Sequence, residues 1–256
     1  MWWARYLVVA MLAASPTTTL ARADSASPAP LRPTVLSRID HDPTAFTEGL
    51  FISGTSLYES TGLLEHSQLR ELDPTTGQLR RSAQLPPTYF GEGIADNGEH
   101  IWQLTYQNGV AIEWDKASLT SVREVPLHGE GWGLCSDGSR LIRSDGTARL
   151  HFHRPEDMEE TGGTQVTYNG SPVPGLNSLS CFGNQIWANV FPTNRIIQID
   201  AATGVVQSVV YADGLLDTPH QDDVDVLNGI AHLDDGQFLL TGKNWPTMYR
   251  VRFDPA

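Results

Sequence analysis

The chain has 256 residues and a net charge of −13, from 30 acidic and 17 basic side chains. A surface of this sign repels phosphate backbones and anionic membranes, because binding to them requires basic patches. Nucleic acid is therefore excluded as a partner, and we interpret the acidity as a feature that favours solubility. The length suits one domain with a large core.

The first 23 residues are typical of a secretory signal peptide. Arg5 supplies a positive start, residues 6–14 form an apolar run too short to span a bilayer, and Ala21-Arg22-Ala23 matches an Ala-x-Ala cleavage site. The alternative is an uncleaved N-terminal anchor. Residues 24–33, rich in Ser, Ala and Pro, predict a disordered leader. We therefore expect an exported protein, periplasmic or secreted, with no membrane contact after cleavage and one domain over residues 34–256.

A tripeptide recurs through this domain at intervals of 40 to 51 residues. Each copy opens with a polar or aromatic residue, continues with a small residue and closes with an aliphatic one. A nearly constant period in this range is typical of repeat architectures. The five copies are Glu48-Gly49-Leu50, Glu92-Gly93-Ile94, Trp132-Gly133-Leu134, Asn177-Ser178-Leu179 and Asn228-Gly229-Ile230.

Each repeat continues with a Gly-bearing turn and two further apolar or alternating runs, such as residues 57–59 and 69–72, which predict β-strands. One small antiparallel sheet cannot bury both of its faces, whereas five arranged radially stack face on face. We therefore predict an all-β fold, a five-bladed β-propeller. A two-sheet sandwich is the structural alternative, but it does not explain the even period.

The two ends of the domain are predicted to meet in one blade. The last run, residues 248–253, supplies only part of a blade, and the extended stretch 34–39 is available to complete it. Pairing of these two runs would close the ring, since closure protects the sheet edges that an open array exposes.

The opening residues of the five tripeptides are predicted to converge. In a propeller the first strand of each blade lies nearest the axis, so equivalent residues meet at one mouth of the central channel. Two carboxyl groups in one small space cannot both ionise easily, which raises one pKa toward the range that proton transfer at neutral pH requires. The structural alternative is a ring of strand caps bonded through water. The ring contains Glu48, Glu92, Trp132, Asn177 and Asn228.

Two pairs of residues leave other readings open. Cys135 and Cys181, the only cysteines, form either a disulfide in an oxidising compartment or two buried free thiols. His151 and His153 share one strand face, but no third zinc ligand lies nearby in the sequence. We therefore expect both histidines at the surface and predict no metal site.

As an ordered set, motifs from residue 46 to residue 246 resemble the glutaminyl cyclases (glutaminyl-peptide cyclotransferases) of the plant and bacterial type. The resemblance implies a five-bladed propeller that converts the N-terminal Gln of peptides or proteins into pyroglutamate with release of ammonia. It also implies that no metal and no other cofactor take part. The main matching stretches are Phe46-Thr47-Glu48-Gly49-Leu50, Tyr58-Glu59-Ser60-Thr61-Gly62-Leu63, Phe90-Gly91-Glu92-Gly93-Ile94, Gly131-Trp132-Gly133-Leu134, Ile186-Trp187-Ala188-Asn189-Val190, Asp225-Val226-Leu227-Asn228-Gly229-Ile230-Ala231 and Thr241-Gly242-Lys243.

The resemblance also implies roles for individual side chains. Glu92 would be the acid/base residue, taking a proton from the attacking amine and returning it to the departing nitrogen. Lys243 and Asn177 would stabilise charge on the carbonyl oxygen, although a lysine at a strand end is also commonly just solvated. The predicted substrate-binding residues are Phe46, Glu48, Tyr106, Trp132, Phe191 and Asn228.

The chain departs from the family pattern at three places. Ser178 and Ser180 stand where the family has Glu, Phe191-Pro192 replaces Trp-Gln, and Tyr106 replaces a Trp of the pocket wall. Groups beside a site tune it strongly, so these changes predict a slower reaction, a shifted substrate preference or a loss of activity.

Two other functions compete with the cyclase. A metal-dependent propeller hydrolase would use the Glu and Asn side chains of the ring as ligands for a hard cation such as calcium. A propeller that binds peptide N-termini without turnover is the second rival, because fold does not imply function. In each case we expect a monomer.

Overall fold

The computed structural model describes residues 28–217 and 223–256. Within these residues β-strands form almost all of the regular structure, and η2, Asp234–Gly236, is a short 3-10 turn. The predicted all-β class is therefore confirmed. No helix in this part of the chain is long and apolar enough to cross a membrane. The predicted signal peptide, residues 1–23, lies outside the described residues.

Three four-stranded sheets follow one another along the chain, each an antiparallel meander in which sequence neighbours are sheet neighbours. The first contains β2 (Thr47–Ser53), β3 (Ser56–Thr61), β4 (Gln68–Leu72) and β5 (Leu79–Gln84). The second contains β6 (Gly91–Asp96), β7 (His100–Thr105), β8 (Val110–Asp115) and β9 (Thr120–Pro126). The third contains β10 (Leu134–Ser136), β11 (Leu141–Ser144), β12 (Arg149–His153) and β13 (Glu160–Gln165), and a hairpin of β14 (Thr167–Tyr168) and β15 (Ser171–Pro172) follows it.

The remaining strands form one sheet of eight, in the order β16-β17-β18-β19-β1-β22-β21-β20. Its strands are β16 (Leu176–Phe182), β17 (Gln185–Val190), β18 (Arg195–Asp200), β19 (Val206–Tyr211), β1 (Ala29–Asp40), β22 (Thr247–Pro255), β21 (Gln237–Gly242) and β20 (Leu227–Leu233). The sheet consists of two antiparallel meanders, and a short parallel pairing between β1 and β19 joins them. The fourth and fifth sequence repeats therefore share one continuous sheet.

Strand β1 brings the two ends of the domain together. It pairs antiparallel with β22, and Thr34 lies opposite Arg252 while Ile39 lies opposite Met248. The predicted pairing of residues 34–39 with residues 248–253 is confirmed. The strand begins earlier than expected, however, because residues 29–33 belong to β1 and not to a disordered leader. The reason is that residues 29–31 pair with the edge of β19, which would otherwise leave its backbone groups without partners.

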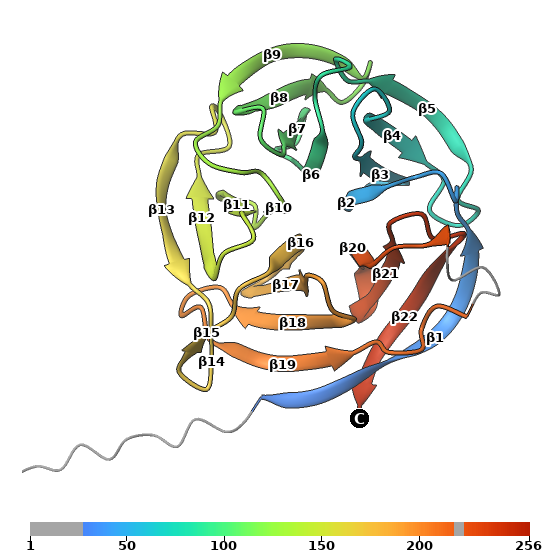
Figure 1. Ribbon diagram of the computed structural model, residues 1–256, viewed down its shortest axis with the longest axis vertical. Helices are drawn as coiled ribbons and strands as arrows, with labels where there is room; N and C mark the ends of the chain where they lie inside the picture. The colour runs from blue at the N-terminus through green and yellow to red at the C-terminus, as the bar shows by residue number, and fades with distance from the viewer. Residues whose placement is uncertain (1–27, 218–222) are drawn as a thin grey trace, which may run out of the picture.

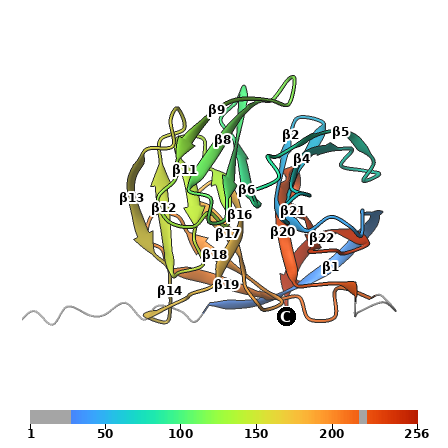
Figure 2. The ribbon, with the colours of Figure 1, turned by 45° about the horizontal axis from the view of Figure 1, so that its top comes forward.

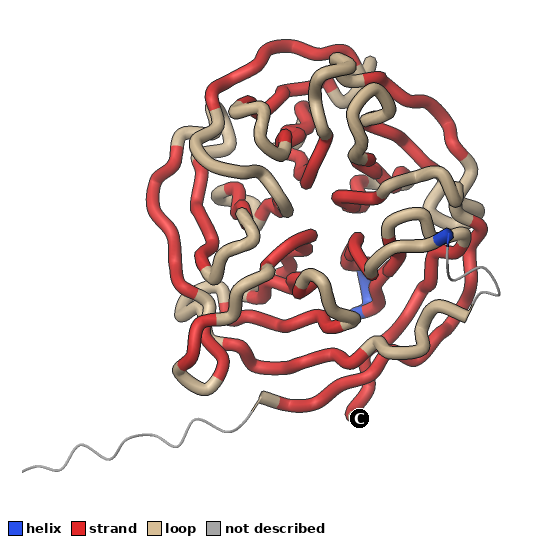
Figure 3. Tube along the Cα trace, viewed as in Figure 1, coloured by secondary structure: helices blue, strands red, loops and turns tan. Residues whose placement is uncertain are grey.

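The sheets stand around a central axis, with β2, β6, β10, β16 and β20 nearest to the centre (Figure 1). These inner strands contact one another in a closed cycle, from β2 through β6, β10, β16 and β20 back to β2. Figure 2 shows the same arrangement in a tilted view, and Figure 3 shows loops that run from the rim of the molecule inward to the inner strands. The start of every inner strand is thereby brought close to the axis.

Clusters of buried apolar side chains fill the spaces between neighbouring meanders. The cluster between the first and second sheets contains Leu69 of β4 and Ile94 of β6. The cluster that closes the ring contains Ile39 of β1, Leu50 of β2 and Leu239 of β21. Burial of this kind contributes about 25 cal/mol per Å² of apolar surface, so face-to-face packing of the sheets holds the inner strands in register around the axis.

Cys135 of β10 and Cys181 of β16 form a disulfide, with their Cα atoms 5.5 Å apart. This separation is typical of disulfides, so adjacent inner strands approach closely enough for a bond. Of the two alternatives that the sequence leaves open, the structure contains the bond and not the free thiols. The bond joins the two inner strands that carry Trp132 and Asn177 at their starts.

Replacing both cysteines with Ala should destabilise the protein by about 3 to 4 kcal/mol. The bond links residues 46 positions apart, and its loss restores the conformational freedom of this loop in the unfolded chain. Urea unfolding of the double variant measures the change, and the wild type with a reductant provides the control. Equal midpoints for the double variant and the oxidised wild type would contradict the expectation.

Candidate active site

Four of the five ring residues lie on irregularities of the inner strands. The strand register shifts at Glu48, at Glu92, at Asn177 and at Asn228, each time between the first and second strands of a meander. A bulge of this kind bends the strand and redirects a side chain. Trp132 lies just before β10 and donates its backbone N–H to the carbonyl of Ser144. Four of the five tripeptides therefore coincide with register shifts, where the bend of the inner strand changes the direction of the side chain.

The small second residue of the tripeptide is required by close packing between inner strands. A Cβ atom on Gly93 would lie 2.4 Å from the backbone nitrogen of Leu134, and one on Gly133 would lie 2.0 Å from the carbonyl oxygen of Asn177. Both distances are far below a van der Waals contact. Glycine at these positions thus lets the strands that carry Glu92, Trp132 and Asn177 come together.

Glu48 is the centre of a polar cluster at the starts of the inner strands. Its Oε1 lies 2.6 Å from Nζ of Lys243, and its Oε2 accepts a hydrogen bond of 2.9 Å from Nδ2 of Asn228. The carboxyl groups of Glu48 and Glu92 also lie close enough to change each other's pKa. The structure therefore brings the predicted acid Glu92 and the predicted cation Lys243 to one place, through a shared contact with Glu48.

Burial changes the ionisation of this carboxyl pair. Burial raises the pKa of Glu48 to about 7, although the Lys243 ammonium acts in the opposite direction. Burial and the neighbouring Glu48 charge together raise the pKa of Glu92 well above its usual range. The pair therefore titrates closer to neutral pH than ordinary glutamates do, which suits a group that accepts a proton in its ionised form and then returns it.

Aromatic rings form a wall around the polar cluster. The contacts run from Phe46 to Phe90, Tyr106, Trp132 and Phe191, with ring centroids 5.7 to 6.5 Å apart. Nζ of Lys243 completes the circle, at 4.5 Å from the ring of Phe46 and 6.0 Å from that of Phe191. Such a wall excludes water and strengthens electrostatic interactions inside it.

Phe90 is the wall residue that the sequence analysis did not assign to the site. A signal for it was present, because Phe90 precedes Glu92 by two positions, as Phe46 precedes Glu48. In the structure the rings of Phe46 and Phe90 contact each other edge to face, so both belong to the aromatic wall. A Cβ atom on Gly62 would lie 2.4 Å from the Phe90 ring, so this glycine makes room for the wall.

Two buried polar atoms in the site have no hydrogen-bond partner among the residues that the structure describes. They are Oε2 of Glu92 and Oδ1 of Asn177, and both side chains are at least nine-tenths buried. An unsatisfied buried polar atom costs about 1 to 3 kcal/mol. Both atoms accept hydrogen bonds, so a ligand that supplies N–H groups inside the aromatic wall would satisfy them.

Comparison with known proteins agrees with this geometry. The sequence profile of the glutamine cyclotransferase family matches residues 7–253. The chain belongs to this family. A glutaminyl-peptide cyclotransferase of Arabidopsis thaliana is 38% identical over 229 residues, which cover 87% of this chain and 71% of the relative. The crystal structure of Myxococcus xanthus glutaminyl cyclase superposes with a TM-score of 0.81 at 34% identity, over 90% of this chain and all of that one.

In this member of the glutamine cyclotransferase family, the departures from the expected motifs have identifiable surroundings. Ser178 is buried and its N–H donates to Oδ1 of Asn228, whereas its hydroxyl has no partner within residues 28–217 and 223–256. The Ser180 hydroxyl accepts the N–H of His232. Tyr106 and Phe191 both contact the ring of Trp132, so the wall is continuous despite the replaced tryptophans.

The histidines of β12 lie away from the ring residues. His151 contacts Asp145 and Glu160 on the partly exposed side of the strand. His153 is buried, which corrects the expectation of a surface position, because the side chain packs between Arg143 and the carbonyl of Met158. The described residues contain no group of three or more His, Cys, Asp or Glu side chains arranged to hold a metal ion.

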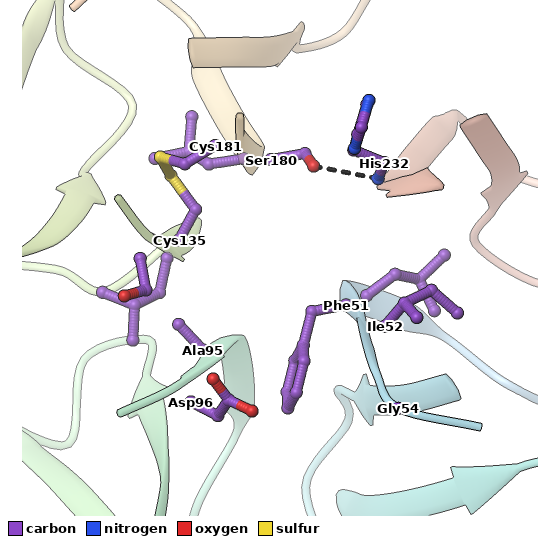
Figure 4. Close-up of a pocket in the computed structure, with 13 residues that line it drawn as sticks. Phe51, Ile52, Gly54, Ala95, Asp96, Cys135, Ser180, Cys181 and His232 are labelled. Atoms are coloured by element: carbon purple, nitrogen blue, oxygen red, sulfur yellow. Dashed lines mark hydrogen bonds between the residues drawn. A yellow bond between two sulfur atoms is a disulfide. The ribbon is translucent and has the colours of Figure 1, made fainter. Parts of the chain in front are cut away.

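The far ends of the inner strands, opposite the carboxyl pair, surround a different environment. A cavity of about 340 Å³ lies there, lined by the later halves of the inner strands. Figure 4 shows the Cys135–Cys181 disulfide, Asp96 and Phe51 around it, with the hydrogen bond between Ser180 and His232. The residues that carry the carboxyl pair lie at the other ends of the same strands.

Gly146→Ala should weaken substrate binding. A Cβ atom at this position would lie 2.7 Å from Cζ2 of the Trp132 indole, so the wall must shift. We expect KM for a Gln-leading peptide to rise about tenfold or more, since a misplacement of about 1 Å is enough for such losses. Steady-state kinetics of the variant measure the effect.

Gly138→Ala is the matched control. Gly138 also has a positive φ, +87° against +78° at Gly146, but no atom lies within 4 Å of its Cβ position. Both variants incur the backbone strain of about 1 to 2 kcal/mol, and only Gly146→Ala should change KM. An unchanged KM in Gly146→Ala, or equal changes in the two variants, would show that Trp132 is not held in place by Gly146.

Proposed function

We propose that this protein is a glutaminyl-peptide cyclotransferase that closes the N-terminal Gln of peptides or proteins to pyroglutamate without a metal ion. One observation carries the proposal: the unpartnered Oε2 of Glu92 lies beside the Glu48–Lys243 ion pair, inside an aromatic wall. A carboxyl group of raised pKa next to a fixed cation is suited to move a proton and to stabilise a developing oxyanion. The reaction is an acyl transfer within one substrate, which places the enzyme among the acyltransferases.

We also propose that the fold is a five-bladed β-propeller. Each expected repeat corresponds to one antiparallel meander, and the eight-stranded sheet divides into two of them at the β1–β19 pairing. The three paired residues at this junction make it far shorter than the β1–β22 ladder. The closed cycle of inner strands supports the same count.

The proposed reaction starts with the neutral α-amine of the substrate. Its nitrogen attacks Cδ of its own side chain, and a proton passes from the amine to Glu92. Glu92 then gives this proton to the departing amide nitrogen, the C–N bond breaks, and ammonia and the five-membered ring remain. No proton is gained or lost by the enzyme over the cycle, because the same carboxyl group accepts and returns it.

The other polar residues bind and orient the substrate in this scheme. Lys243 has three N–H donors, so it can stay paired with Glu48 and still donate to the carbonyl oxygen. The unpartnered Oδ1 of Asn177 can accept a substrate N–H, while the Nδ2 group of the same side chain can donate to the oxyanion. Phe46, Phe90 and Trp132 enclose the folded side chain and bring the amine and carbonyl together.

We propose that the protein is located outside the cytoplasm, in the periplasm or the surrounding medium. Residues 1–23 have the pattern of a cleavable signal peptide. The Cys135–Cys181 disulfide fits an oxidising compartment. We propose a monomer that acts on exposed peptide N-termini.

Release of ammonia from a Gln-leading dipeptide tests the function. We expect stoichiometric ammonia and pyroglutamyl product, with the same rate after treatment with a chelator. Loss of activity on chelation, restored by a divalent cation, would favour the metal-dependent hydrolase. No ammonia at any pH, with intact binding of peptide N-termini, would favour the binding protein.

Glu48→Gln should move the acidic limb of kcat/KM to lower pH. The Glu48 charge raises the pKa of Glu92, and Gln removes this charge. Lys243 also loses its partner and is left to stabilise the ionised form of Glu92. Profiles from about pH 5 to about pH 9 with one substrate measure the shift, since the substrate amine titrates equally in both proteins. An acidic limb at unchanged or higher pH would contradict the coupling.

A further inference from the structure

His41 faces hydrogen-bond acceptors on both sides of its ring. Nδ1 lies 2.7 Å from the carbonyl oxygen of Trp245, and Nε2 lies 2.8 Å from Oε1 of Glu59. A carbonyl oxygen only accepts, and so does an ionised carboxylate, so each nitrogen must carry a proton to make its contact. The geometry therefore describes an imidazolium, almost fully buried, and not a neutral histidine.

The groups around His41 sustain this charge. Glu59 also accepts from the Thr47 hydroxyl at 2.7 Å and lies 3.4 Å from Arg70, whose other nitrogen pairs with Asp42. The charged groups facing the ring are thus two carboxylates and one guanidinium. Burial alone lowers the pKa of His41, but the Glu59 carboxylate outweighs it and the pKa lies above its usual value. The pKa of Glu59 is lowered, against burial, by His41 and Arg70.

His153 is the opposite case within the same protein. Its Nδ1 lies 2.8 Å from the carbonyl oxygen of Met158 and donates to it, while its Nε2 accepts from Nε of Arg143 at 3.1 Å. One donor and one acceptor describe a neutral ring. Burial lowers the pKa of His153, in agreement with this geometry. The described part of the chain therefore contains one buried histidine that is charged and one that is neutral.

The contacts of His41 connect the two backbone segments that carry Glu48 and Lys243. Thr47, bonded to Glu59, directly precedes Glu48, and Trp245, bonded to His41, follows Lys243 by two residues. A backbone hydrogen bond from Asn244 to Ala45 lies between them. The ion pair in the site and the His41–Glu59 pair behind it are thus two cross-links between the same two segments.

We propose that doubly protonated His41 is a positioning residue, which holds the loop of Lys243 against the strand of Glu48 and so keeps the ammonium at the carboxyl pair. The consequence for activity rests on the proposed function, whereas the charge of His41 and its effect on the loop do not. Because the folded state favours the charged ring, this contribution is complete below about pH 6.5 and is lost as pH rises through the raised pKa of the folded state.

Nitrogen NMR of the imidazole rings tests the charge directly. At neutral pH we expect both nitrogens of His41 to be protonated, and one nitrogen of His153 to be protonated in the same sample. Spectra of the wild type alone decide this point, so it does not depend on whether any variant folds. A neutral His41 at neutral pH would overturn the proposal.

The same substitution at both histidines tests the function of the charge. Gln carries one donor group and one acceptor, which reproduces the contacts of His153 but not those of His41. We expect His41→Gln to speed amide hydrogen exchange at Lys243, Asn244 and Trp245 and to lower kcat/KM roughly tenfold, the size expected for losing one charge-assisted hydrogen bond. His153→Gln should change neither.

The outcomes separate the inference from the proposed function. Unchanged exchange at these amides in a folded His41→Gln variant would overturn the positioning role, whatever the activity. Increased exchange with unchanged kcat/KM would also overturn it, since the loop would then move without consequence for the reaction. A protein that releases no ammonia, yet shows a charged His41 and the expected exchange pattern, would refute the cyclase and leave the cross-link established.

Discussion

Glu92→Gln should yield a folded protein whose kcat is lower by about 10²- to 10⁴-fold. The amide has nearly the shape of the carboxyl group but cannot accept the proton of the attacking amine, and acid/base groups contribute about this much to catalysis. Stability should change little, because the substitution removes a buried carboxyl group whose pKa is already raised well above its usual range. Ammonia release under saturating substrate measures the loss.

Glu113→Gln is the control for this prediction. Glu113 is a second buried glutamate of the same sheet and lies on β8, away from the ring residues. It pairs with Arg123 of β9 and His100 of β7. Its replacement should lower the unfolding midpoint and leave kcat unchanged. A Glu92→Gln variant that retains kcat within about tenfold of the wild type would remove Glu92 from the proton transfer.

Lys243→Met should abolish most of the activity and destabilise the protein in a pH-dependent manner. The variant leaves two buried carboxyl groups without their cation, and removing one partner of a buried ion pair costs about 3 to 5 kcal/mol when the other stays charged. Glu48 avoids this cost by binding a proton. Since Lys243 lowers the pKa of Glu48, that pKa rises further in the variant, and the folded state then binds more protons than the unfolded state. Stability should therefore fall as the pH rises above the ordinary range of a glutamate.

The double variant Glu48→Gln/Lys243→Met separates charge from shape. Without either charge, the cluster should regain most of the lost stability, because neutral replacements of a buried pair are often tolerated. The destabilisation should also depend less on pH than in the single variant, since Glu92 is then the one carboxyl group of the pair that still titrates. Activity should not return, since the ammonium is absent. Denaturant unfolding at about pH 5.5 and about pH 8 measures both effects. A single variant with equal stability losses at the two pH values would show that Glu48 does not depend on Lys243 for its charge.

Much of the fold follows from local patterns along the chain. Alternation of apolar and polar residues predicts the strands, and glycines such as Gly54 and Gly138 mark the turns between them. The short last repeat predicts that the N-terminal segment must supply a strand. The start of β1 at Ala29 was missed, because residues 29–31 have no strand pattern of their own and become ordered only against the edge of β19.

The site was predicted less completely than the fold. The equivalence of tripeptides indicates that Glu48, Glu92 and Asn228 converge, and the cluster contains all three. Phe90 was overlooked although it repeats the position of Phe46, because aromatic residues before a strand are usually part of a core. His41 carries no sequence signal at all, since its partners Glu59 and Trp245 lie 18 and 204 positions away.

The repeating features could be read from the amino-acid order alone, because strand periodicity, turn glycines and small residues where inner strands touch are local requirements of backbone geometry. Which charges neutralise one another depends on the folded arrangement. The pairing of Glu48 with Lys243, the charge of His41 and the Cys135–Cys181 bond all join residues that are distant in sequence. Such pairs depend on distances of a few ångströms and on the loss of water around them, and both exist only once the sheets have closed around the axis.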